Sequence, residues 1–183
     1  MKTHLLIAAL LVVSLLASAQ TEEKKEKLSR KERKELRKIE KEETRKKVTK
    51  LIESKQYVLK ADYLKNPFGH YRSVNESKNF IWVDSLLSVF QMVEYRAGMA
   101  GGLVGLTIEG KIYDYELIPH KRLKSNYIRF KVKSYDGDYR VFMEVMANGK
   151  TSAQIYNYIG QRMDYQGRLV SQDEAGILKG KGY

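Results

Sequence analysis

Carboxylates on predicted strands are the side chains of this sequence best suited to chemistry. Five acidic residues lie on or near segments with strand-like alternation, namely Asp62, Glu94, Glu109, Asp114 and Glu116. A glycosidase uses two such carboxylates about 5–9.5 Å apart. Nothing in the sequence brings a particular pair together. A carboxylate-dependent hydrolase acting on glycans is therefore the alternative interpretation, and solvated strand residues or turn caps are the simpler one.

Aromatic side chains offer a second kind of site. The chain has 13 Tyr and one Trp, and such rings combine apolar faces with polar rims that suit sugars or peptides. Trp82, Tyr113 and Tyr115 are candidate ligand contacts, and we expect the two tyrosines on one side of their strand because they are two residues apart. The competing interpretation is that these rings fill the core or its edges.

Other catalytic and metal-binding patterns are missing from the sequence. The chain has no Cys, which excludes disulfides, thiolate metal sites and a cysteine nucleophile. His70 and His120 lack the paired spacing of a zinc site, and no G-x-S-x-G motif marks a serine hydrolase. The glycine-rich run 98–105 is not followed by the Lys-Ser/Thr of a phosphate loop. We therefore assign no catalytic, cofactor-binding or metal residue and expect no cofactor.

A short triad, Asp84-Ser85-Leu86, resembles the acceptor sequence of a bacterial periplasmic O-glycosylation system. Three residues alone also fit an ordinary tight turn between strands. Ser85 is the candidate glycosylation site, and its use would place it on the surface.

The first 19 residues predict a secretory signal peptide. Lys2 provides a basic start, residues 5–16 an apolar run, and Ala17-Ser18-Ala19 a small-residue cleavage site. The apolar run is shorter than the roughly 20 residues that a membrane span needs. We expect cleavage before Gln20 and a periplasmic or secreted protein, not an integral membrane protein.

Residues 20–55 predict a charged helical leader, rich in Lys, Glu, Arg and Leu and free of Gly and Pro. The apolar seam of a coiled coil is missing. Val48, Leu51 and Ile52 share one helical face and are expected to dock on the following domain, with the earlier turns in solvent. The chain carries a net charge of +12, but interleaved glutamates dilute the field of this leader. A solvated helix is favoured over a basic arm that binds anionic partners, and no nucleic acid is expected.

From residue 56 to residue 183 the apolar period changes to two, which predicts an antiparallel, mainly β domain. Eight segments are rich in Tyr, Val, Ile and Phe and are expected as strands: 56–64, 79–83, 86–95, 106–117, 127–134, 138–147, 151–159 and 162–170. The pattern leaves open whether they form a sandwich or a partly closed barrel.

Two residue pairs, Asp136-Gly137 and Asn148-Gly149, predict two-residue hairpin loops that define a three-stranded meander. With both loops tight, Val141 faces Val132 on one side and Tyr156 on the other. The opposite face carries lysines and Phe142. The expected core face is Ile128, Phe130, Val132, Tyr139, Val141, Met143, Val145, Tyr156 and Tyr158.

The order of short motifs along residues 56–183 resembles the family called domain of unknown function 4251. The segments that carry the resemblance are 58–63, 79–81, 98–112, 145–150, 164–169 and 178–180. The resemblance implies an exported protein of Gram-negative bacteria without an assigned activity. It leaves the charged helix outside the match and supplies no catalytic residue.

Together these observations favour a small exported β domain that acts as a non-catalytic binding or envelope-associated module, with the glycan hydrolase as its rival. The partner classes that fit are a glycan, a lipid or an envelope protein. An enzyme should show acidic residues converging in a cleft, whereas a binding module should show an aromatic-lined groove without them.

Overall fold

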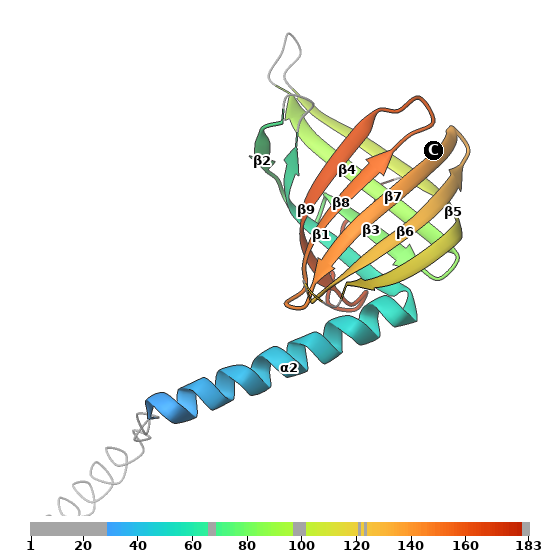
Figure 1. Ribbon diagram of the computed structural model, residues 1–183. Coiled ribbons are helices and arrows are strands. Elements are labelled where there is room, and N and C mark those ends of the chain that lie inside the picture. Colours follow the sequence, from blue (N-terminus) through green and yellow to red (C-terminus); the bar gives the residue numbers. More distant parts are fainter. Residues whose placement is uncertain (1–28, 66–68, 97–101, 121, 123, 181–183) are drawn as a thin grey trace, which may run out of the picture. The chain divides into compact units, whose positions relative to one another are not determined.

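The structure is a computed structural model that describes residues 29–65, 69–96, 102–120, 122 and 124–180 (Figure 1). The predicted signal peptide and the cleavage site before Gln20 lie outside these residues. The described residues form the helix α2 (Arg30–Ser54) and nine strands. The strands are β1 (Gln56–Lys65), β2 (Tyr71–Ser73), β3 (Phe80–Asp84), β4 (Leu87–Arg96), β5 (Gly102–His120), β6 (Ser125–Ser134), β7 (Gly137–Met146), β8 (Lys150–Tyr156) and β9 (Arg162–Val170).

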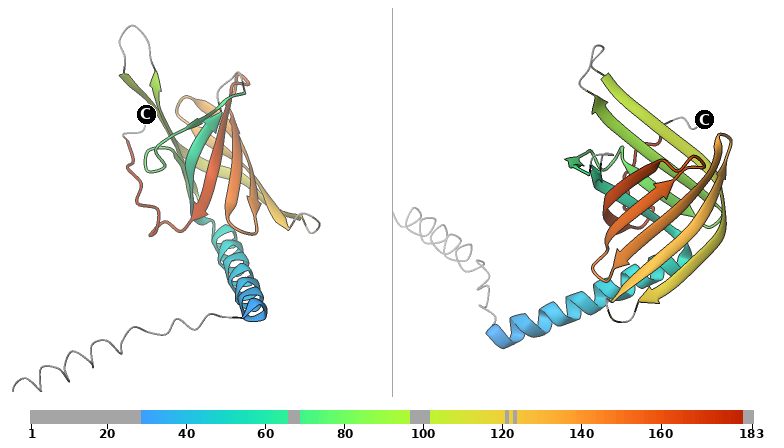
Figure 2. Two further views of the ribbon diagram at one scale, coloured as in Figure 1. Left: turned by 90° about the vertical axis from the view of Figure 1, so that its left-hand side faces the viewer. Right: turned by 45° about the horizontal axis from the view of Figure 1, so that its top comes forward.

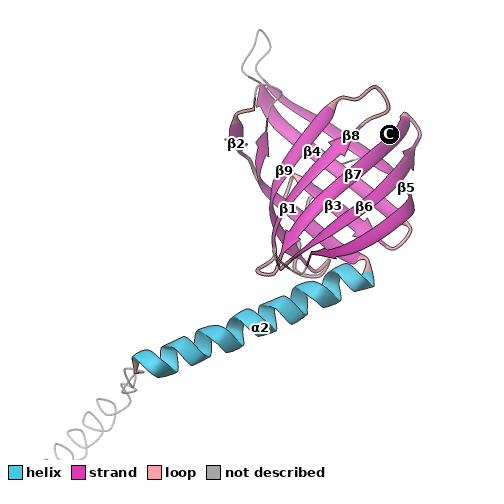
Figure 3. Ribbon diagram, viewed as in Figure 1, coloured by secondary structure: helices cyan, strands magenta, loops and turns pink. Residues whose placement is uncertain are grey.

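The strands form a closed antiparallel barrel (Figures 1 and 3). β1 pairs with β3, each of β3 to β8 pairs with the next strand along the chain, and β9 returns to pair with β1. The short β2 pairs with the end of β1 that β3 leaves unpaired. The mainly β prediction is confirmed, and of the sandwich and the partly closed barrel that it left open, the structure has a barrel, closed by eight strands and with one extra strand. Closure removes the free edges that an open sheet would expose.

The barrel interior is filled with side chains. Alternate residues of every long strand point inward, and many of them are fully buried. The largest buried side chains that the strands contribute to this core are Tyr57, Leu59, Leu64, Ile81, Phe90, Ile128, Phe130, Met143, Ile155 and Tyr165. This packed interior stabilises the fold and leaves the outer surface as the place to look for a partner.

The first predicted hairpin is displaced, but its faces are correct. Ser134 pairs with Gly137, so the loop consists of Tyr135 and Asp136 instead of Asp136 and Gly137. Val141 consequently faces Phe130 and not Val132. Because this displacement moves the pairing by two residues, every side chain of β6 and β7 keeps the face predicted for it.

The second predicted hairpin is wrong by one residue. Its loop has three residues between β7 and β8, and the third, Gly149, has a φ of 81°, which is the arrangement of a three-residue hairpin loop. Val141 therefore faces Ile155, which is buried, and not Tyr156. A shift of one residue exchanges the faces of a strand, so Tyr156 and Tyr158 do not belong to the core.

The charged helix is confirmed over residues 30–54. A capping box begins it, because the Ser29 N–H donates to Glu32 Oε2 at 2.7 Å and the Glu32 N–H donates to Ser29 Oγ at 3.3 Å. Val48 and Ile52 are 5% and 1% exposed and pack on the barrel core, as predicted. Residues 38–183 form one compact unit. In the described part of the chain, no helix has the length and apolar character needed to cross a membrane.

Residues 171–180, here called the C-terminal strap, cover the outer face of β3 and β4 (Figure 2). Ala175 is buried and Ile177 is half-buried against Phe80 and Val89. The Leu178 N–H donates to the Ser77 carbonyl at 2.8 Å. On this side of the barrel, the strands are therefore buried on both faces.

Candidate functional site

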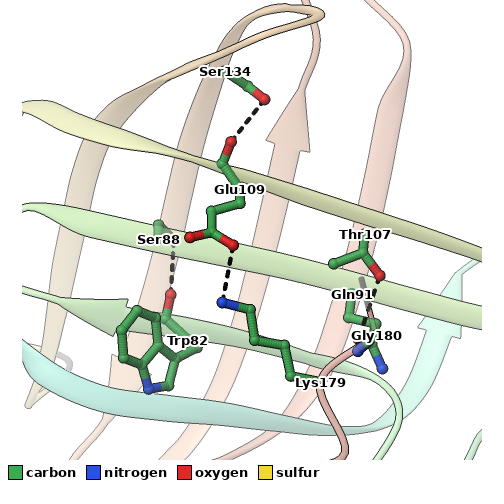
Figure 4. Close-up of polar contacts among 8 residues, drawn as sticks. All are labelled: Trp82, Ser88, Gln91, Thr107, Glu109, Ser134, Lys179 and Gly180. Carbon is green, nitrogen blue, oxygen red and sulfur yellow. Dashed lines mark hydrogen bonds and ion pairs between the residues drawn. The ribbon is translucent and has the colours of Figure 1, made fainter. Parts of the chain in front are cut away.

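Trp82, a predicted ligand contact, lies on the outer face of β3 beside the C-terminal strap (Figure 4). The Lys179 Nζ atom lies 5.9 Å from the centre of its ring, and the same ammonium forms a 2.9 Å ion pair with Glu109 Oε2. The Ser88 hydroxyl donates to the Trp82 carbonyl at 2.8 Å. A segment of the same chain thus occupies the position that a ligand of Trp82 would need.

A buried glutamine holds the strap in place (Figure 4). Gln91 is 3% exposed, and its Nε2 donates to the Lys78 carbonyl at 3.0 Å and to the Leu178 carbonyl at 2.8 Å. Its Oε1 accepts from the Gly180 N–H at 2.7 Å and from the Thr107 hydroxyl at 3.4 Å. Because one amide satisfies groups from three segments, the strap is an integral part of the barrel wall.

Tyr115, the second predicted contact, lies inside the junction between α2 and the barrel. Its ring stacks on Phe130 with centroids 5.7 Å apart. Its hydroxyl lies 3.2 Å from that of Tyr57 and donates to the Ile52 carbonyl at 3.4 Å. Burial raises the pKa of the Tyr115 phenol, and the hydrogen bond with Tyr57 lowers it by less. Tyr115 is therefore a core-filling ring, as in the competing interpretation, and not a ligand contact.

A β-bulge separates Tyr113 from Tyr115, so the prediction that they share one side is wrong. Tyr113 pairs with Lys131, whereas Glu116 pairs with Arg129, which leaves one extra residue in β5. Asp114 lies there with a φ of 52°. An extra residue reverses the alternation of the strand, and Tyr115 points inward while Tyr113 points outward.

Tyr113, the third predicted contact, lies on the outer surface. Its hydroxyl donates to Asp138 Oδ2 at 3.1 Å, and the Lys131 Nζ atom lies 5.5 Å from the centre of its ring. Desolvation raises the pKa of the Tyr113 phenol, and the hydrogen bond to Asp138 raises it further. The ring is half-buried and faces solvent with its polar rim already oriented.

Four outward rings on neighbouring strands form what we call the aromatic wall: Tyr113 of β5, Tyr127 of β6, Phe142 of β7 and Tyr156 of β8. Phe142 is 39% exposed and meets Tyr156 edge to face, with centroids 5.8 Å apart. The Arg140 guanidinium lies 6.0 Å from the centre of the Tyr156 ring. Sequence reasoning found Tyr113 and placed Phe142 outward, but it assigned Tyr156 to the core and did not single out Tyr127.

A shallow groove of about 330 Å³ runs over the middle of the aromatic wall. Tyr127, Phe142 and Ile118 supply its apolar surface, and Arg129, Gln154 and a single carboxylate, Glu144, supply polar groups. The groove therefore combines an exposed ring with a guanidinium and an amide, which can stack on one face of a ligand while hydrogen-bonding its edge.

The candidate carboxylates do not form a pair suited to hydrolysis. Glu109, Asp114 and Glu116 each form an ion pair with a partly exposed base, at 2.9, 2.8 and 2.5 Å. Asp62 is exposed, and the side chain of Glu94 lies outside the described residues. A glycosidase acid is normally kept protonated by an apolar or like-charged environment, and a cationic partner has the opposite effect. Within the described ranges, no group of three or more His, Asp or Glu side chains could hold a metal ion.

Ser85 lies in the tight turn between β3 and β4, as predicted. Its φ is 47°, its side chain is exposed, and its N–H donates to the Lys55 carbonyl at 2.8 Å. The turn presents the hydroxyl to solvent, and its glycosylation stays a prediction.

The fold is a closed antiparallel barrel preceded by a helix. Comparison with known proteins assigns the chain to a family. The chain belongs to the family described as domain of unknown function (DUF4251), whose model matches residues 39–169. The match begins within α2, earlier than the expected start at residue 56, and ends before the strap.

A solved structure shares this fold. The chain is similar to a DUF4251 family protein from Bacteroides eggerthii, with 19% sequence identity and a TM-score of 0.63. The similarity covers 76% of this chain and 95% of the other. No protein among those with curated functions matches this chain. The comparisons therefore define the family and the fold.

Proposed function

We propose that this protein is an exported, non-catalytic binding module of the cell envelope, and that its aromatic wall binds a glycan. The groove over Tyr127 and Phe142 carries the proposal, because it offers one exposed and one half-buried ring beside Arg129 and Gln154 on a rigid sheet. A sugar ring presents apolar C–H groups on its faces and hydroxyls at its edge, so it matches rings that are flanked by polar side chains.

The rigidity of the wall supports this function. Tyr127, Phe142 and Gln154 come from three adjacent strands whose backbone pairing is continuous. Side chains on a paired sheet keep their spacing without a ligand, so little ordering entropy is lost on binding. A shallow site of this kind suits a linear or branched chain that lies across the strands.

The charges around the groove favour a glycan over a lipid. The Arg129–Glu116 and Lys131–Asp114 ion pairs cross the same outer face and interrupt its apolar surface. Phe142 and Ile118 are each only 39% exposed. A lipid surface binds best to a broad, continuous apolar face, whereas sugar hydroxyls can accept from these cations and donate to these carboxylates.

The export part of the proposal is supported by the sequence of residues 1–19, with its basic start, apolar run and small-residue cleavage site. N-terminal sequencing of protein recovered from the periplasm or the medium should begin at Gln20. A retained Met1 would contradict export by this route.

A binding titration against a panel of soluble oligosaccharides of neutral sugars tests the glycan site. Phe142→Ala and Gln154→Ala should each weaken the best ligand about tenfold, as expected when a stacking surface or a hydrogen bond is lost. Tyr135→Ala is the control, because Tyr135 is 95% exposed in the β6–β7 turn and does not line the groove.

Two outcomes would overturn the proposal. Equal affinities for the wild type and both groove variants would exclude the aromatic wall as the site. Release of new reducing ends from a bound oligosaccharide would favour the hydrolase instead.

A further inference from the structure

A separate depression lies at the barrel end where the last turns of α2 dock. Its volume is about 310 Å³. Arg45 and Thr49 of the helix line one side, and Lys124, Ser125 and Asn126 from the start of β6 line the other. The described residues that line it include two permanent cations, two hydroxyls and one amide, and none of them is acidic.

The docking of the helix fixes the cationic side of this depression. Val48 lies between Arg45 and Thr49 in the sequence, is 5% exposed, and packs into the barrel core. The Lys47–Glu174 ion pair, at 2.7 Å, joins the same turn to the C-terminal strap. Arg45 and Thr49 are therefore presented from a turn whose position is set by buried contacts.

Ser125 provides an independent sign that something binds here. The residue is 4% exposed, and its Oγ is the one buried side-chain polar atom without a hydrogen-bond partner within the described part of the chain. Tyr127 is nearby: desolvation raises the pKa of its phenol, Glu144 raises it further and Ser125 lowers it, but Ser125 Oγ forms no hydrogen bond. A buried hydroxyl in this state is unfavourable unless a partner arrives.

A carboxylate already occupies the edge of the cationic site. Glu42 Oε1 lies 2.6 Å from an Arg45 guanidinium nitrogen. The hydrogen bond from Arg45 lowers the pKa of the Glu42 carboxyl, and the charge of Lys124 lowers it further. Both members of this pair are about half exposed, and such pairs are weak. A stronger oxyanion can therefore displace Glu42 from Arg45.

We propose that this depression binds a phosphate-type oxyanion. Arg45 and Lys124 supply the charge, and the Ser125 hydroxyl donates its unused hydrogen bond to an anion oxygen. A guanidinium matches the geometry of a tetrahedral oxyanion well. Glu42 acts as a local competitor that leaves when the anion binds. This inference does not depend on the glycan site.

Amide NMR titration of the protein with inorganic phosphate at constant ionic strength tests the proposal. Saturable shifts should centre on Thr49, Ser125 and Asn126. Arg45→Gln and Lys124→Gln should each weaken phosphate about tenfold, because each removes a charge-assisted hydrogen bond. Ser125→Ala should weaken it severalfold without unfolding the protein.

The direction in which one further variant changes the affinity for phosphate gives the sharpest test. Glu42→Gln should strengthen phosphate binding about threefold or more, because the competing carboxylate is removed. Glu76→Gln is the matched control, since Glu76 is also an exposed glutamate in an ion pair, with Lys60 at 3.0 Å. Equal effects of these two changes, or shifts spread over surface lysines without saturation, would overturn the proposal. Repeating the titration with glycerol phosphate and with anionic lipid vesicles separates a soluble source of the phosphate from a headgroup.

Discussion

Two outer faces of the barrel both carry aromatic side chains, yet only one is open. Under the C-terminal strap, Val58, Phe80 and Val89 are 0% exposed although they point away from the barrel interior. On the aromatic wall, Phe142 is 39% exposed between rows of ion pairs. An aromatic residue that points out of a barrel is therefore a candidate contact only where the chain itself leaves the face uncovered.

The difference between a covered and an open outer face is visible in the apolar pattern of each strand's sequence. Strands buried on both faces read as continuous apolar runs, as in Tyr57-Val58-Leu59 of β1 and Phe80-Ile81-Trp82-Val83 of β3. Strands with one wet face alternate, as in Lys131-Val132-Lys133 of β6. The continuous runs could have shown that Trp82 lies on a covered face.

The largest expected effect on stability comes from comparing two substitutions, one on each of these outer faces. Phe80→Ala should lower the free energy of unfolding by roughly 3–5 kcal/mol, because it leaves a cavity under the strap. Phe142→Ala should cost about 1 kcal/mol or less, because the ring is already partly in water. Urea titration of both variants measures the difference. Similar losses would mean that the two faces are equally buried.

A second comparison uses two glutamines. Gln91→Ala should cost about 1–3 kcal/mol, because the partly buried backbone groups of Lys78, Leu178 and Gly180 lose their hydrogen-bond partner. Gln154→Ala changes an exposed amide on the aromatic wall and should stay within about 0.5 kcal/mol. Thermal unfolding compares them. If Gln91→Ala were the milder change, the strap would not be held by this amide.

The pH dependence of stability in the alkaline range distinguishes a tyrosine buried in the barrel interior from an exposed one. Burial raises the pKa of the Tyr57 phenol well above its ordinary value. The unfolded chain therefore loses this proton near pH 10 while the folded protein keeps it, and stability falls as pH rises above about 10, by up to about 1.4 kcal/mol per pH unit.

The variant Tyr57→Phe should flatten this decline, whereas Tyr135→Phe, at a residue that is 95% exposed, should leave it unchanged. Denaturant titrations between pH 8 and pH 11, in steps of about one unit, check the slope. An unaltered slope in Tyr57→Phe would show that other groups dominate the alkaline response.

The smallest effect concerns the ion pairs of the wall. Lys131→Ala removes the 2.8 Å pair with Asp114, and both side chains are about half exposed. Such pairs contribute about 0–1 kcal/mol, so the free energy of unfolding should change by about 0.5 kcal/mol or less. Chemical denaturation at low and high salt measures it. A large, salt-independent loss would assign Lys131 a role in packing.

Local periodicity predicted most of the strands, and local exceptions account for the errors. The alternation of β6 and β7 is unbroken, so their faces were predicted correctly. In β8 the face was wrong because a third loop residue precedes it, and Asn148-Gly149 fits a two-residue or a three-residue loop equally well. The bulge at Asp114 has no sequence signal stronger than one aspartate, a residue that tolerates positive φ.

Contacts between residues far apart in the chain limit how much of the candidate site could be predicted from the sequence. Tyr113 and the outward position of Phe142 follow from strand alternation. The covering of Trp82 depends on Lys179, which is nearly 100 residues away in the chain. The cationic depression joins Arg45 to Lys124 through the docking of a helix on a barrel. Such contacts depend on the closed topology of the barrel, which the periodicity of the individual strands does not predict.

The pairing of β1 with β9 has a consequence for how the protein forms. Val58 pairs with Val170 and Lys65 with Asp164, so the strand that is synthesised first can complete its pairing only when the last one is available. Contacts between such distant segments form slowly because a long loop must close. Until Val170 is available, β1 and β8 each present an unpaired edge that can associate with another chain. A chain interrupted within β9 should therefore aggregate, and protection of the growing chain matters most in the interval before its last strand arrives.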